Sequence, residues 1–258
     1  MALKACFYNN NSTLTCSSIY TTKKLSLSLI NVINMRSIVY LILTVILAPG
    51  LAYSGTIKGN TVFSGKASPL KAYKTGKYKK VCGPEVPNET LLINNKGLKN
   101  VVLSLHGKKL KPKAGEYHID QKKCRYVPHV IAMPVDSELK IHTSDPINHN
   151  IHTYSFDNDP INIMFTPDQE EYAQEMEEAE IVKVECDLHS WMTSWIVVTP
   201  NSYFSVSGTN GSFEIADVPP GKYKLTAWHE TLGNLSKDIT VVDGEVKINF
   251  DFVEAEQE

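Results

Sequence analysis

The chain has 258 residues, of which 42% are hydrophobic and 21% are charged. These proportions are those of an ordinary globular protein that is large enough for one or two domains. They exclude a disordered, collagen-like or disulfide-dense chain as a description of the whole sequence.

The formal net charge of −2 hides an asymmetry. Residues 58–125 hold 16 Lys and Arg against 4 Asp and Glu, a net charge of +12, whereas residues 126–258 hold 6 against 24, a net charge of −18. Either two solvated surfaces partly neutralise each other, or one of them is an electrostatic docking face for a charged partner. The basic half has no recognition motif or interleaved aromatic residues, so we expect no nucleic-acid partner.

The beginning of the chain resembles an export signal. Met35-Arg36 precedes an apolar run from Ile38 to Ala48, and Ala52-Tyr53-Ser54 follows it. We predict a signal peptide over 35–54 that is cleaved after Ser54, which places the mature chain in the periplasm or outside the cell without stable membrane insertion. Residues 1–34 would then be an upstream extension from a start codon chosen too early, or a lengthened charged region. An uncleaved anchor is the alternative, because residues 25–33 are also apolar.

Signal cleavage leaves three cysteines, Cys82, Cys124 and Cys186. An odd number is informative in an oxidising compartment. One disulfide and one metal-bound thiolate account for all three, and we predict a Cys82–Cys124 disulfide with Cys186 free. A disulfide that used Cys186 would remove the metal hypothesis.

The mature chain reads as strands. In residues 55–63, polar and apolar side chains alternate and glycines interrupt them, which predicts the first strand. Residues 66–80 are basic and rich in turn residues, which predicts a surface loop. Further strands are predicted at residues 101–105, 130–135, 139–143, 151–156, 181–184 and 195–198. Residues 168–180, with seven acidic side chains, are the only candidate helix, and a solvated acidic loop is the alternative.

The last sixty residues predict a separate unit of short strands. Residues 204–207 and 212–215 flank Asn210-Gly211, a hairpin signal. Residues 223–228, 239–242 and 246–252 continue the pattern, with Asp243-Gly244 between the last two. The fold class is therefore all-β, a sandwich or a barrel.

Cys186-Asp187-Leu188-His189-Ser190-Trp191-Met192 holds a thiol, an imidazole and a thioether at intervals of three residues. Two imidazoles, one thiolate and a weak axial Met form the blue-copper electron-transfer site. His149, after the Asp145-Pro146 break, offers the second imidazole. We therefore predict that one copper ion is bound by His149, Cys186, His189 and Met192. Asn150 would support the ligand loop by a hydrogen bond.

Other candidates have weaker patterns. His152 is a minor alternative ligand, since on a strand it faces away from His149. His129 could form a second soft site with Cys124 and His152. Trp191 either packs or covers the copper, and His229-Glu230 is expected to be structural. Three further histidines show no partner pattern: His106, His118 and His142.

These residues resemble the cupredoxin family. The resemblance rests on Tyr126, Pro128, Leu139, Ile141, Asp145, His149-Asn150 and Cys186-x2-His189-x2-Met192. The loop spacing is similar to that of amicyanin, and the chain looks most like bacterial periplasmic methylamine-utilisation or cupredoxin-like proteins. Those proteins join a plastocyanin-like domain to a carboxypeptidase-regulatory-like, transthyretin-like sandwich. Asp136-Ser137 departs from the family by replacing the usual glycine of a strand turn.

The resemblance covers roughly residues 97–258 and implies two domains. A cupredoxin Greek-key sandwich would occupy 111–199, and the regulatory-like sandwich would occupy 200–258, where Val218-Pro219-Pro220-Gly221 and Trp228-His229-Glu230 are typical. Residues 55–110 would form an N-terminal β segment that completes the C-terminal sandwich, because sixty residues alone leave exposed edges.

The function that the resemblance implies is one-electron transfer by a type 1-like mononuclear copper site. The edge of His189 would be the exit toward a redox partner such as a c-type cytochrome or a dehydrogenase. No enzyme signature is present, so we expect no enzymatic activity. The alternatives are a copper-binding or copper-delivery protein, and a non-redox module for adhesion or carbohydrate contact.

Overall fold

The computed structural model describes residues 4–8, 14–18, 53–66, 70–169 and 171–253, in two units, Met1–Ala52 and Tyr53–Glu258. In the first unit, β1 (Lys4–Tyr8) and β2 (Leu14–Ser18) pair antiparallel within the predicted upstream extension. Most of the predicted signal peptide, residues 35–52, lies outside the described residues. No helix in the described ranges combines the length and the apolar character needed to cross a membrane.

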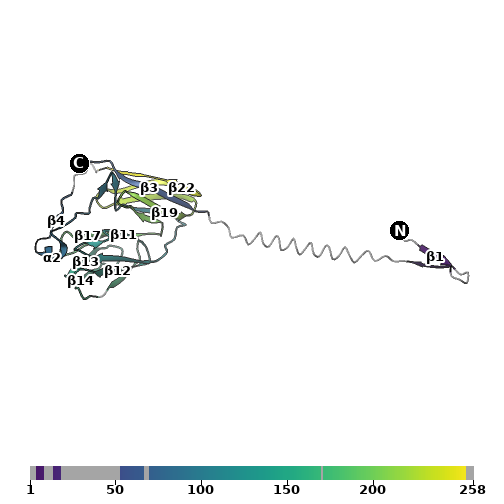
Figure 1. Ribbon diagram of the computed structural model, residues 1–258, viewed down its shortest axis with the longest axis horizontal. Helices are drawn as coiled ribbons and strands as arrows, with labels where there is room; N and C mark the ends of the chain where they lie inside the picture. The colour runs from purple at the N-terminus through teal and green to yellow at the C-terminus, as the bar shows by residue number, and fades with distance from the viewer. Residues whose placement is uncertain (1–3, 9–13, 19–52, 67–69, 170, 254–258) are drawn as a thin grey trace. The chain divides into compact units, whose positions relative to one another are not determined.

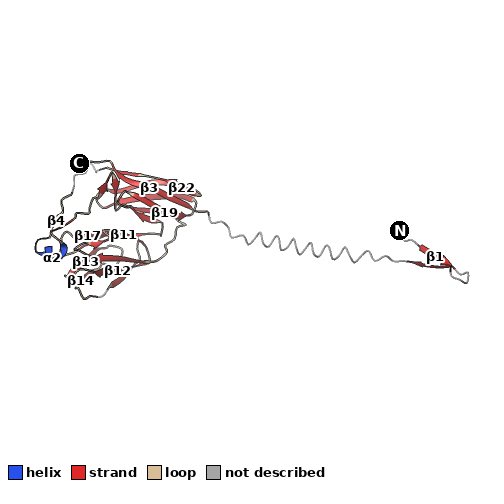
Figure 2. Ribbon diagram, in the orientation of Figure 1, coloured by secondary structure: helices blue, strands red, loops and turns tan. Residues whose placement is uncertain are grey.

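The second unit is built almost entirely of strands (Figure 2), which confirms the all-β fold class. Its middle forms one sandwich, which we call the inserted sandwich. A four-stranded sheet in the order β10-β9-β12-β15 packs on a five-stranded sheet in the order β11-β17-β16-β13-β14. The strands are β9 (Glu116–Gln121), β10 (Tyr126–Val127), β11 (Val130–Pro134), β12 (Ser137–Thr143), β13 (His149–Tyr154), β14 (Asn162–Phe165), β15 (Tyr172–Met176), β16 (Ile181–Glu185) and β17 (Thr193–Thr199).

Alternation of polarity builds this sandwich. Along β12, Leu139 and Ile141 are fully buried, whereas Glu138, which lies between the buried residues Ser137 and Leu139, is exposed. The predicted helix or acidic loop at 168–180 is wrong, because β15 lies within it and pairs with β12. Along β15, partly buried and exposed residues alternate, and the strand ends at the buried Met176. This period of two is typical of a strand, and the many acidic residues do not prevent the strand from forming.

The second sandwich, which we call the split sandwich, takes strands from both sides of the inserted one. Its sheets have the orders β18-β8-β20-β21 and β19-β3-β7-β6, with β22 and β23 also on β3. The strands are β3 (Gly55–Phe63), β6 (Ile93–Asn94), β7 (Gly97–Leu98), β8 (Val102–His106), β18 (Phe204–Val206), β19 (Ser212–Val218), β20 (Gly221–His229), β21 (Gly233–Val241), β22 (Gly244–Lys247) and β23 (Phe250–Phe252). In Figure 1, β3 lies beside β19 and β22.

The hairpin predicted at Asn210-Gly211 is wrong. β18 pairs with β8, whereas β19 pairs with β3 in the other sheet, so the turn carries the chain from one sheet to the other. The turn still needs its glycine, because Gly211 has a φ of +78° and a Cβ there would meet the backbone oxygen of Thr61 at 2.2 Å. Turn residues specify a reversal of the chain, but they do not specify the sheet that the next strand joins.

Residues 73–86 form a compact segment that we call the disulfide strap. It contains β4 (Tyr73–Lys74), the 3₁₀ turn η1 (Gly76–Tyr78), the short helix α2 (Lys79–Cys82) and β5 (Glu85–Val86), and β4 pairs with β5. A disulfide joins Cys82 to Cys124, and Cys82 and Val86 are buried in the core of the inserted sandwich. Residues 55–110 are therefore divided, since β3, β6, β7 and β8 belong to the split sandwich and the strap packs on the inserted one.

The two sandwiches meet through a small apolar cluster that contains Val102, Val130, Ala132 and Val197. The Trp195 and Trp228 rings pack edge to face there, with centroids 5.2 Å apart. Glu230 accepts a hydrogen bond from Trp195 Nε1 at 2.9 Å and pairs with His129.

The buried imidazole of His229, next to Glu230, should make the stability of the protein depend on pH. Burial, opposed by Glu230, lowers its pKa from 6.5 to about 4. The His229 imidazole binds a proton more tightly in the unfolded chain than in the folded one. The stability that neutral His229 contributes is therefore present above pH 6.5 and is lost as the pH falls toward 4. The loss amounts to about 3 kcal/mol.

His229→Asn keeps an acceptor for the Thr231 N–H, which His229 Nδ1 holds at 3.2 Å. We expect urea unfolding between pH 7 and 4 to show a smaller fall in stability for this variant than for the native chain. Equal falls in the two proteins would contradict the assignment to His229.

Candidate metal centre

The ligand loop begins where β16 ends and finishes where β17 starts. His189 N donates to Cys186 O at 3.3 Å, Met192 N donates to His189 O at 2.8 Å, and Cys186 N donates to Met192 O at 3.1 Å. These bonds fold the predicted C-x2-H-x2-M segment into a closed loop. Because the loop joins two paired strands, its ligands are fixed to the sheet.

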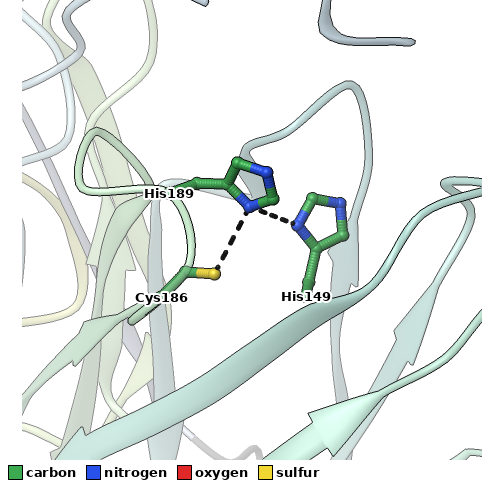
Figure 3. Close-up of side chains that lie close together, drawn as sticks. All are labelled: His149, Cys186 and His189. Atoms are coloured by element: carbon green, nitrogen blue, oxygen red, sulfur yellow. Dashed lines mark hydrogen bonds between the residues drawn. The ribbon is translucent and has the colours of Figure 1, made fainter. Parts of the chain in front are cut away.

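Three of the predicted ligands converge. His149 is the first residue of β13, which pairs with β16, and its side chain points at the loop (Figure 3). The Nδ1 atoms of His149 and His189 lie 3.1 Å apart, and Cys186 Sγ lies 3.7 Å from His189 Nδ1. All three residues are at most 3% exposed, and their ligand atoms lie within 4.8 Å of one another.

The donor set fits a soft or borderline metal ion. His149 Nε2 is bonded to Asp145 at 2.9 Å, which leaves Nδ1 directed at the cluster. One sulfur and two imidazole nitrogens therefore face one point, and this combination suits copper or zinc. His189 Nε2, on the other side of its ring, is buried without a hydrogen-bond partner in the described part of the chain.

The protonation states of His189 and Cys186 favour metal binding. Burial lowers the pKa of His189 to about 4, with His149 and Lys77 adding to the shift, so this imidazole is neutral at pH 7. Burial opposes ionisation of Cys186, but hydrogen bonds from His149 and from backbone N–H groups lower its pKa overall. Neutral imidazole and thiolate are the forms that bind metal ions.

Asp145 positions His149. Its carboxylate accepts the backbone N–H groups of Lys123 at 2.6 Å and Cys124 at 2.7 Å in addition to His149 Nε2. Burial opposes its charge, but the bond with His149 and the two backbone bonds lower its pKa overall. Burial alone would lower the pKa of His149, but the hydrogen bonds and charges of Asp145 and Cys186 raise it overall.

Asn150 lies where it was expected to support the loop. Its Oδ1 accepts the Asp187 backbone N–H at 2.7 Å, and its Nδ2 donates to Asp187 Oδ2 at 2.7 Å. The buried Tyr126 hydroxyl donates to Asn150 O at 2.5 Å and lies 3.0 Å from Glu185 O, so it bridges β13 and β16.

The structure separates the other candidates. Met192 is 1% exposed at the end of the loop, and its axial contact remains a prediction. His152 Nδ1 lies 3.2 Å from Asp187 Oδ1, outside the three-residue cluster. The alternative site with His129 and Cys124 is wrong, because Cys124 is in the disulfide and His129 pairs with Glu230.

Sequence reasoning missed Tyr78. Its ring lies edge to face on His189, with centroids 4.3 Å apart, and Trp191 flanks the same imidazole at 5.3 Å. His189, whose edge is the predicted exit toward a redox partner, is only 1% exposed, and its role as the exit remains a prediction. The available signal was the predicted disulfide, because it brings the residues before Cys82 to the turn at Cys124, whose carbonyl accepts Trp191 Nε1 at 3.2 Å.

Comparisons with known proteins give partial matches. A family model described as Polysaccharide lyase family 4, domain II matches residues 181–247, which include β16 and β17 of the inserted sandwich and β18–β22 of the split one. No curated protein matches the chain.

Among solved structures, a Cu-containing nitrite reductase from Thermus scotoductus SA-01 is 15% identical over 33% of this chain and 22% of its own, with a TM-score of 0.30. The chain thus spans about a fifth of that reductase. A purple cupredoxin from Nitrosopumilus maritimus is 19% identical over 32% of this chain and 98% of its own, with a TM-score of 0.28. An amicyanin mutant in the Cu(I) state is 18% identical over 37% and 98%, with a TM-score of 0.29.

The Asn150 bonds predict a measurable effect on the metal centre. In Asn150→Ala, the Asp187 N–H loses its acceptor and the ligand loop loses its tie to β13. We expect the affinity for Cu(I) to fall about 10- to 100-fold, as for other residues that orient metal ligands. Competition against a chromophoric Cu(I) chelator measures this change.

Asn158→Ala is the matched control, because Asn158 bonds to Glu178 and Glu180 and contacts no candidate ligand. An affinity unchanged in Asn150→Ala, or lowered equally in both variants, would contradict the role of Asn150.

Proposed function

We propose that this protein binds one copper ion at His149, Cys186 and His189, with Met192 as a weak fourth ligand, and that it carries single electrons in an exported compartment. The convergence of one buried thiol and two imidazole Nδ1 atoms carries this proposal. When bound, copper supplies a one-electron change between Cu(I) and Cu(II). Export agrees with the disulfide, which persists in oxidising compartments.

Burial of the centre supports electron transfer over catalysis. The three ligands are 0–3% exposed, and the Tyr78 ring covers the outer side of His189. A substrate has no open route to the ligand atoms in the described structure, whereas an electron needs none. The role of the protein's own groups is to hold the ligands rigidly, through Asp145 on His149 and Asn150 on the loop.

We propose that the redox partner docks on the strap. Lys77, Lys79 and Lys80 are exposed and form no ion pair within the described residues, and Lys77 lies over the Tyr78 ring at 4.9 Å. A redox protein with an acidic surface, such as a c-type cytochrome or a dehydrogenase, would be attracted to these cations. Tyr78 would be the ring between that partner and His189.

The alternatives have weaker support. Copper delivery requires that the ion leave the centre, and the strap closes the centre over His189. A non-redox module for adhesion or carbohydrate contact is supported by the Polysaccharide lyase family 4, domain II match, which bears mostly on the split sandwich.

Optical absorption tests the centre. We expect the protein to bind one Cu(II) and to show an intense visible band from thiolate-to-copper charge transfer. Cys186→Ser should abolish the band because it removes the thiolate, and Met192→Leu should shift it. Tight Cu(I) binding without the band would favour delivery, and an absence of copper binding would favour the non-redox module.

Replacement of the strap cations tests the docking surface. With the reduced copper protein and hexacyanoferrate(III) as an anionic oxidant, we expect Lys77→Glu/Lys79→Glu/Lys80→Glu to slow electron transfer about tenfold or more at low salt. A cationic cobalt(III) complex should react faster with the same variant. Stopped-flow absorption of the copper band measures both rates.

The control carries the same charge change on Lys108, Lys109 and Lys222, which are exposed outside the strap. Equal effects of the two triple variants would show a response to net charge alone and would contradict docking at the strap.

A further inference from the structure

The four-stranded sheet of the inserted sandwich carries a second histidine cluster on its outer face. Ile119 of β9 and Ile141 of β12 are fully buried in the core, so the residues beside them in each strand point to the opposite face. His118, Asp120 and His142 are such residues, and they share no member with the buried centre.

The strand register brings a carboxylate to each side of His142. Asp120 of β9 is its direct partner in the ladder. On the other side Ile141 pairs with Tyr172, so Glu171, just before β15, lies next to His142. Asp120 of β9, His142 of β12 and Glu171, just before β15, therefore lie in one row, and His118 of β9 lies one row away on the same face.

The side chains meet at distances suited to a metal ion. Glu171 Oε2 lies 3.7 Å from His118 Nδ1 and 3.9 Å from His142 Nδ1. Ligands about 2.0 Å from a tetrahedral zinc ion lie about 3.3 Å apart, so a small side-chain rotation completes the site. The side chains of His118, His142 and Glu171 are 51%, 37% and 40% exposed, whereas the Nδ1 atom of His142 is itself shielded from solvent.

Unsatisfied atoms point to the same place. Asp120 Oδ2 is bonded to the Ser144 hydroxyl at 2.8 Å, and Asp120 Oδ1 lies 3.5 Å from His142 Nε2. Asp120 Oδ1 and His142 Nδ1 have almost no contact with solvent and no hydrogen-bond partner among the described residues. Unpaired buried acceptors are uncommon in folded proteins and call for a partner. If Asp120 holds the Nε2 proton of His142, the Nδ1 lone pair faces Glu171.

We propose that His118, His142 and Glu171 bind one Zn²⁺ ion, with Asp120 as the residue that orients His142. Two imidazoles and one carboxylate are common ligands of zinc, and water supplies the remaining position. A carboxylate that accepts the second N–H of a ligand histidine is the usual support of such sites. The site has no sulfur ligand, unlike the buried centre. A bound ion would join β9 and β12 to the residue that precedes the edge strand β15.

Calorimetry with Zn²⁺ on the full chain tests this site. The titrations use native protein already loaded with Cu(I) and, separately, the Cys186→Ser/His189→Gln variant, so that zinc has no access to the buried centre. We expect one Zn²⁺ per chain in both. His118→Gln, His142→Gln and Glu171→Gln should each weaken binding at least tenfold, and Asp120→Asn about tenfold.

His106→Gln is the matched control, since His106 is exposed and, among the described residues, its side chain bonds only to Thr226 Oγ1. Its affinity for zinc should equal that of the native chain. Zinc-edge X-ray absorption of the Cu(I)-loaded protein should show nitrogen and oxygen ligands without sulfur. An absence of zinc binding, unchanged binding in His142→Gln, or a sulfur ligand at the zinc edge would each overturn the proposal.

Discussion

The buried carboxylate of Asp145 is the group on which the candidate metal centre depends. Its oxygens accept three N–H groups, the His149 imidazole and the backbones of Lys123 and Cys124. Lys123 and Cys124 both have positive φ, 51° and 55°, a conformation that non-glycine residues rarely adopt. The same carboxylate thus fixes a ligand and stabilises the turn that presents Cys124 to Cys82. Through that disulfide it also holds the strap whose Tyr78 covers His189.

This linkage gives the centre an enclosed character. The His189 ring is surrounded by the rings of Tyr78, Trp191 and His149. Its Nε2 atom is therefore not solvated, in contrast to a ligand histidine whose second nitrogen faces water. The low pKa of His189 is a consequence of that burial. Enclosure and rigidity suit the proposed one-electron role, and the strap is the surface that the proposed partner would meet.

The sequence predicted those parts that depend on short spacing or on chemical type. The C-x2-H-x2-M segment forms the expected loop, Asn150 bonds to it, and the cysteine arithmetic agrees with the disulfide and the free, buried Cys186. The errors concern long-range placement. Asn210-Gly211 marks a real turn, but the sheet that β19 joins depends on β3, far away in the chain. His118 and His142 showed no pattern because the register of β9 against β12 sets their neighbours.

The split sandwich also constrains the order of folding. The Thr61 backbone N–H in β3 donates to the carbonyl of Gly211, 150 residues later, and β22 and β23 pair with β3 from still farther along the chain. The strands of the inserted sandwich follow one another without interruption, so it can collapse while β3 is still unpaired. Contacts of such long range are slow to form because loop closure must precede them. A partly folded chain would therefore expose the edge of β3. Folding of the inserted sandwich would bring the two halves of the split sandwich together.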